Sequence, residues 1–70
     1  MTGFVKSLIS SKGFGFISAN KKEYFFHRDD YQGDWNDLII DFDNGKEPIQ
    51  VEFEEVKSSK GPRAAQVRSA

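Results

Sequence analysis

The sequence predicts an all-β fold, a small five-stranded antiparallel barrel. Apolar and aromatic residues recur with a period of two rather than 3.6, which is typical of strands. Short clusters of Gly, Pro, Asn and Ser separate these segments as turns would. The chain has 70 residues, which suffices for a single domain over residues 1–70 with a small core. A closed barrel suits such a chain because it leaves no strand edge open to aggregation.

The first half of the chain contains three predicted strands. Residues 3–10 (GFVKSLIS) alternate roughly between apolar and polar side chains and are followed by a turn at residues 11–13. The second strand is predicted at residues 14–18 (FGFIS). After a short polar connection at residues 20–22, the third strand covers residues 23–27 (EYFFH), which are dense in aromatic side chains.

The second half contains a long connection and two more strands. Residues 28–47 are polar and acidic, and we expect a long loop there with a short helical or extended turn at 37–40. An Asn-Gly turn and a proline then precede a fourth strand at 49–56, where apolar residues alternate cleanly with Gln and Glu. Residues 58–62 are predicted as a loop, and residues 64–69 as the fifth strand.

The second and third predicted strands carry more aromatic side chains than one core can hold. Residues two apart in a strand share a face, so Ile17 can join Tyr24 and Phe26 in the core. A second set then lies on the opposite face: Phe14, Phe16, Phe25 and His27. No amphipathic helix is expected to cover that set, so we expect it to be exposed. The alternative, with Phe14 and Phe16 in the core and Ile17 outside, remains open.

An exposed aromatic surface indicates binding, and nucleobases are suitable partners. Every base has a flat π-face, and stacking on an aromatic side chain contributes about 1–3 kcal/mol per base. Lys6, Lys12 and Arg28 flank the aromatic segments and are expected to meet phosphates.

Charge is unevenly distributed along the sequence. Residues 1–28 carry five basic residues and one acidic residue, a net charge of +4, and residues 56–70 carry four basic residues. Residues 29–55 carry ten acidic residues and one basic residue, a net charge of −9. The distribution fits a basic binding face opposite an acidic one, or ordinary solvated charge. A protein-interaction module that uses the acidic segment is the alternative function.

Several other classes of function lack support in the sequence. There is no Cys, so thiolate metal sites and disulfides are excluded. His27 is the only His and has no nucleophile placed beside it in sequence. Asp29 and Asp30 are expected to be solvated or to pair with Arg28. We therefore expect no enzyme, no metal and no cofactor.

The expected location and assembly state follow from similar observations. No leader segment, in which basic residues precede an apolar run, follows Met1. No apolar run reaches the roughly 20 residues that span a bilayer. We expect a cytoplasmic protein with no membrane partner. It should be a monomer, or a strand-exchanged dimer with the long loop as hinge.

Four segments resemble the cold-shock domain family. Residues 12–17 (KGFGFI) and 24–27 (YFFH) resemble its two ribonucleoprotein motifs, residues 2–6 (TGFVK) its first strand, and residues 60–67 (KGPRAAQV) its C-terminal motif. The resemblance implies an OB-fold barrel that binds single-stranded RNA or DNA with low sequence selectivity. It also implies a role as an RNA chaperone or as a regulator of transcription or translation, including in stress response.

The chain departs from the family pattern at the stacking positions. Ser7 stands where the family usually has a stacking Trp, and Arg28 stands where it usually has a Phe. Trp35 either stacks on a base from the loop or plugs the end of the barrel. Lys60 and Arg63 form either a rim that contacts phosphate or a plain solvated loop. The candidate nucleic-acid-binding residues are Lys6, Lys12, Phe14, Phe16, Phe25, His27, Arg28, Trp35, Lys60 and Arg63.

Overall fold

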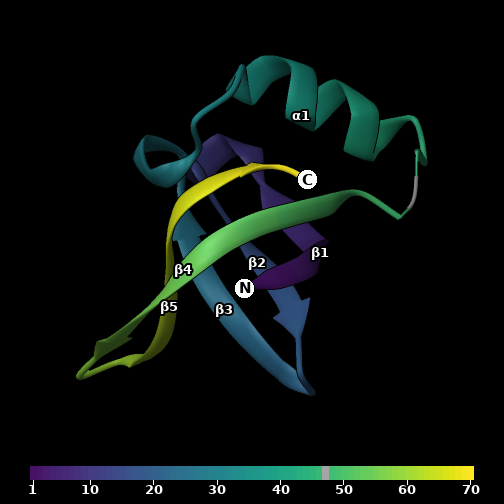
Figure 1. Cartoon of the computed structure of the whole chain (residues 1–70). Helices are drawn as coiled ribbons and strands as arrows, with labels where there is room; N and C mark the ends of the chain where they lie inside the picture. The colour runs from purple at the N-terminus through teal and green to yellow at the C-terminus, as the bar shows by residue number, and fades with distance from the viewer. Residues whose placement is uncertain (47) are drawn as a thin grey trace.

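The computed structural model describes residues 1–46 and 48–70, and these residues fold into a closed five-stranded barrel with one α-helix (Figure 1). This confirms the predicted barrel. The strands are β1 (Thr2–Ile9), β2 (Phe14–Ala19), β3 (Lys22–His27), β4 (Gln50–Ser58) and β5 (Gly61–Ser69). The helices are α1 (Trp35–Asp43) and the short 3-10 turns η1 (Ser10–Lys12) and η2 (Arg28–Asp30).

The strands close in the order β1-β2-β3-β5-β4. One of the five seams, as we call the pairings of neighbouring strands, is parallel. β3 and β5 pair in parallel through Phe25 and Arg63, whereas the other four seams are antiparallel. The predicted five-stranded barrel is thus antiparallel at every seam except this one. An odd number of strands in a closed ring cannot alternate in direction all the way round, so one seam must be parallel.

The barrel interior contains the side chains that the alternation predicted. Ile17, Tyr24 and Phe26 are almost fully buried, and Val51 and Phe53 of β4 join them. Phe14, Phe16, Phe25 and His27 are only half-buried and lie on the opposite side of the same strands. The alternative that placed Phe14 and Phe16 in the core is therefore wrong.

Gly15 separates Phe14 from Phe16 because β1 and the core leave no room for a side chain there. A Cβ at this position would lie 2.6 Å from both the Leu8 Cδ2 and the Ser7 carbonyl oxygen, and 3.0 Å from Phe26 Cε1. Such contacts cannot be accommodated in a packed interior without movement. The glycine allows β1 to approach β2 closely at the point where the two outer rings are displayed.

The long connection contains a helix, α1, that is longer than the short turn expected at 37–40. Asp34 caps α1 by accepting hydrogen bonds from the backbone N–H groups of Asn36 and Asp37, at 2.9 and 3.2 Å. Leu38 is buried and Phe42 packs against the core. The short helical or extended turn expected at 37–40 lies within α1, whereas the loop expected around it is wrong over residues 35–36 and 41–43. Glu47, at the end of that predicted loop, lies outside the described residues.

No amphipathic helix was expected to cover the outer aromatic set. The structure does contain an amphipathic helix, α1, but α1 lies away from that set. Trp35 of α1 contacts Phe26, with ring centroids 5.9 Å apart, and Phe26 points into the barrel. Figure 1 shows α1 lying across one end of the barrel. Because α1 packs on the barrel end, it leaves the outer aromatic set uncovered.

β4 and β5 form a longer hairpin than predicted. The two strands pair up to Ser58 and Gly61, so the predicted loop at 58–62 is a tight turn at residues 59–60. The Ser58 hydroxyl donates a hydrogen bond of 2.8 Å to the Gly61 carbonyl. Figure 1 shows the hairpin projecting away from α1. It carries Lys60 and Arg63 beside β3.

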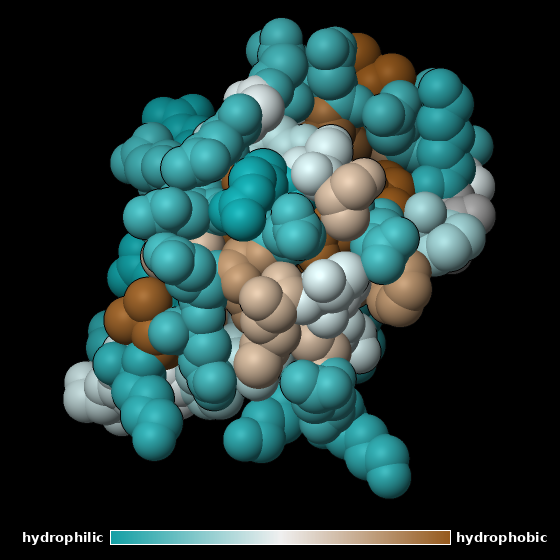
Figure 2. All heavy atoms as spheres, viewed as in Figure 1, coloured by the Kyte–Doolittle hydropathy of each residue, from teal (hydrophilic) through white to brown (hydrophobic). Residues whose placement is uncertain are grey.

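Hydrophilic side chains cover most of the face shown in Figure 2, along α1 and the β4–β5 hairpin. Among residues 1–46 and 48–70, no helix has the length and apolar character needed to cross a membrane.

Candidate nucleic-acid interface

Three aromatic rings meet on the outer surface of β2 and β3, and we call them the ring cluster: Phe14, Phe16 and Phe25. The ring centroids are 6.0 Å apart for Phe14 and Phe16, 5.2 Å for Phe14 and Phe25, and 5.9 Å for Phe16 and Phe25. The register places Phe16 directly opposite Phe25. The cluster is therefore held together by its own edge and face contacts, and each half-buried ring keeps surface for a ligand.

His27 extends the ring cluster along β3. It pairs with Phe14 in the sheet register. Its Nδ1 accepts a hydrogen bond of 3.1 Å from the Asp29 backbone N–H, which places the ring proton of the neutral imidazole on Nε2. Asp30 accepts from the His27 backbone N–H at 3.2 Å. These two bonds form the cap of η2, and the bond to Nδ1 orients the imidazole beside Phe14.

A hollow of about 470 Å³ lies between the ring cluster and the β4–β5 hairpin. Phe16 and Phe25 line one side, and the hairpin lines the other with Ser58, Lys60, Gly61, Pro62 and Arg63. The hollow thus has flat apolar rings on one wall and two cations on the other. Such a composition suits a nucleobase and its phosphate.

Arg63 is oriented by two contacts. Its guanidinium carbon lies 5.7 Å from the centroid of the Phe25 ring, and its Nη2 lies 3.1 Å from Asp30 Oδ2. The expectation that Asp30 is solvated or pairs with Arg28 is therefore wrong. The parallel seam between β3 and β5 is what brings Asp30 and Arg63 together, and it is not visible in the sequence.

The other predicted cations lie at the β1–β2 turn and on β1. The Arg28 side chain packs over Gly13, where a Cβ would lie 3.2 Å from Arg28 Cδ, and its backbone N–H donates to the Gly13 carbonyl at 2.9 Å. Lys12 is exposed at the end of η1, next to Gly13. Lys6 on β1 forms an exposed ion pair with Glu23 on β3. Arg28 and Lys12 thus lie at the β1–β2 turn, which precedes Phe14.

Two further positions bear on the predicted site. Ser7 pairs directly with Phe16, so the residue that replaces the usual Trp adjoins the ring cluster. Trp35 contacts Phe26 on the core side of β3, and the ring centroids of Trp35 and Tyr31 are 6.4 Å apart. Of the two expected placements, the structure has Trp35 at the barrel end and outside the ring cluster.

Among the described residues, the one titratable group with a perturbed pKa lies on the interior side of the sheet. Burial raises the pKa of the Tyr24 hydroxyl, and the carboxylate of Glu55, 3.4 Å away, raises that pKa further. The hydroxyl therefore stays protonated at neutral pH and keeps its bond to Glu55. In the part of the chain that the structure describes, no three His, Asp or Glu side chains gather as metal ligands would.

The family model of the 'cold-shock' DNA-binding domain matches residues 1–70, the full length of the chain. The chain belongs to the cold-shock domain family. Membership confirms the predicted resemblance, accords with an OB-fold barrel, and indicates nucleic-acid binding. No curated protein matches the chain at a significant level.

The cold-shock domain places residues at the candidate interface that the sequence interpretation did not include. Ser58 and Pro62 line the hollow, and Asp30 orients Arg63. Their roles depend on the hairpin length and on the β3–β5 seam, which are both long-range features. The Lys-Gly-Pro-Arg stretch at residues 60–63 was the one sequence feature that indicated a role for this hairpin.

Proposed function

We propose that this cold-shock domain binds single-stranded RNA or DNA through the ring cluster and His27, and that it acts in the cytoplasm as an RNA chaperone or a regulator of transcription or translation. The observation that carries the proposal is the mutual contact of three outer rings beside a hollow that Lys60 and Arg63 line. Bases stack on the rings, and phosphates meet Lys6, Lys12, Arg28, Lys60 and Arg63.

The mechanism requires no covalent chemistry. A base within a duplex is stacked and paired, so its face cannot reach the ring cluster. Binding therefore favours unpaired strands, and a ligand that prefers one of two states shifts the equilibrium toward that state. An RNA hairpin is expected to open in proportion to the difference in affinity between its two forms.

Titration with a short oligothymidine at several salt concentrations tests the proposal. Three to five cations in contact with phosphate predict a slope of log affinity against log salt of about −2 to −3.5, at about −0.7 per contact on single strands. Calorimetry is the primary measurement, because Trp35 lies outside the ring cluster and its fluorescence can stay unchanged on binding.

The acidic surface offers the second candidate function. Asp37, Asp43 and Glu54 are exposed on α1 and β4, and a protein partner with basic side chains would dock there. Absence of oligothymidine binding at any salt concentration would overturn the nucleic-acid proposal and favour this candidate.

Ser7→Trp is expected to tighten binding to oligothymidine by about fivefold or more. Ser7 lies opposite Phe16 in the β1–β2 register, so an indole there enlarges the ring cluster by one stacking surface, with a contribution of about 1–3 kcal/mol. Ser69→Trp, an exposed strand position on β5, is the control and should leave the affinity unchanged. Equal affinities of Ser7→Trp and the unmodified chain would contradict the placement of Ser7 beside a base.

A further inference from the structure

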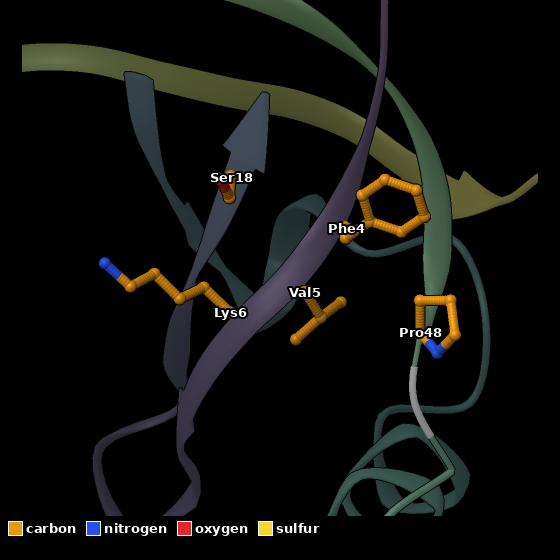
Figure 3. Close-up of a pocket in the computed structure, with 5 residues that line it drawn as sticks. All are labelled: Phe4, Val5, Lys6, Ser18 and Pro48. Carbon is orange, nitrogen blue, oxygen red and sulfur yellow. The ribbon is translucent and has the colours of Figure 1, made fainter. Parts of the chain in front are cut away.

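A second apolar site lies on the outer surface of the barrel at Phe4, separate from the ring cluster. Phe4 is 44% exposed. It lines a shallow pocket of about 370 Å³ together with Val5, Lys6, Ser18 and Pro48. Figure 3 shows the rings of Phe4 and Pro48 beside each other, with Lys6 extending away from them. Of the residues that line this pocket, the proposed function uses Lys6 alone and assigns no role to Phe4 or Pro48.

Phe4 lies on the same outer face as the ring cluster. It pairs with Ser18 in the β1–β2 register, and Ser18 is two residues from Phe16 on β2. Cross-strand partners and residues two apart share a face. With strands about 4.8 Å apart and a rise of about 3.4 Å per residue, the Cα atoms of Phe4 and Phe16 are separated by about 8 Å. The two rings therefore belong to one continuous surface.

Lys6 lies between the two apolar sites and supplies a positive charge. It forms an ion pair with Glu23, but both side chains are more than half exposed, at 55% and 54%. Exposed ion pairs of this kind contribute little to stability. Lys6 can therefore exchange the Glu23 carboxylate for a phosphate at little cost. A strand that runs from Phe16 to Phe4 would bring a phosphate to this position.

We propose that Phe4 and Pro48 form an additional nucleobase subsite, which binds a base of the same strand beyond those on the ring cluster. The inference rests on the proposed function. The flat apolar pocket suits the face of a base, the cation of Lys6 suits the phosphate, and the surface continues from the ring cluster. A side chain of a protein partner would also suit the apolar pocket. In that case, however, the effect of Phe4 would not depend on the length of a bound oligonucleotide.

The length dependence of oligothymidine binding tests this subsite. Affinities of the full chain are measured by calorimetry for oligomers of about four to ten nucleotides, which lie within the range of site sizes of OB folds. Phe4→Leu removes the ring and keeps an apolar side chain on β1, whereas Phe4→Tyr keeps the ring. Ile40→Ala is the control, since Ile40 is an exposed apolar residue on α1. Thermal unfolding establishes that each variant is folded.

The expected result is a difference that grows with oligomer length. Phe4→Leu should match the unmodified chain on the shortest oligomers and bind the longer ones at least about fivefold more weakly, while Phe4→Tyr and Ile40→Ala retain full affinity. An equal affinity of Phe4→Leu at every length would overturn the subsite and leave the proposed function intact. An equal loss at every length would also overturn it, because Phe4 would then act through the ring cluster. Absence of binding by the unmodified chain would overturn both proposals.

Discussion

Phe26→Ala is expected to lower the free energy of unfolding by about 3–5 kcal/mol, the usual cost of deleting a phenyl ring from a core. Phe26 is fully buried, and its ring contacts Trp35 at the barrel end. A 70-residue domain has a total stability of roughly 3–10 kcal/mol. The variant should therefore be largely or partly unfolded at 37 °C, and chemical denaturation followed by circular dichroism measures the loss.

Phe25→Ala is the matched control, because the two residues are adjacent and have the same side chain. Phe25 lies on the outer face and is half-buried against Phe14 and Phe16. We expect it to lower stability by no more than about 1.5 kcal/mol, the scale of aromatic pair contacts. Similar losses from the two variants would contradict the assignment of Phe26 to the interior and of Phe25 to the surface.

The alternation of side chains was enough to predict these two faces from the sequence. In β2 and β3 the choice between two faces has large consequences, because a shift of one residue would exchange every interior side chain for an exterior one. The adjacent strand β3 limits the choice, since its Tyr24 and Phe26 must share a side with Ile17 of β2. Gly15 agrees with this assignment, because its position between two outer rings faces the crowded interior.

The full length of α1 was missed although its signals are present in the sequence. Asp34 is a favoured N-cap residue, and Trp35, Leu38 and Phe42 follow at the spacing of one helical face. The abundance of Asp between these residues favoured the interpretation as a loop. The apolar face of α1 closes the barrel end, so the helix is stabilised by tertiary packing that a local pattern shows only weakly.

The contacts around the ring cluster could be predicted in part. The rings themselves follow from spacing within β2 and β3, which is a local property. The pairing of Arg63 with Asp30 and Phe25 depends on the parallel seam, and the pairing of Lys6 with Glu23 spans β2. Such contacts join residues 17 to 38 positions apart in sequence, and no local pattern encodes them.

Phe16→Ala is expected to weaken binding to oligothymidine by about 1–3 kcal/mol, or roughly 5- to 150-fold, while the domain stays folded. Phe16 occupies the centre of the interface: it contacts Phe14 and Phe25, lies opposite Ser7, and lines the hollow that Arg63 also lines. Its removal deletes one stacking surface and loosens its two neighbours. Calorimetric titration gives the affinity, and thermal unfolding of the same samples gives the stability.

Phe16→Tyr separates the loss of a ring from other effects of the substitution, because it keeps the flat surface and should bind nearly as well as the unmodified chain. Val56→Ala removes another exposed apolar side chain and should leave affinity unchanged. Because Phe16 and Phe25 are in contact, Phe16→Ala combined with Phe25→Ala should cost less than the sum of the two separate losses. Unfolding of Phe16→Ala, or full retention of its affinity, would contradict the role of this ring, since a surface that binds bases must lose affinity and keep its fold when one of its rings is removed.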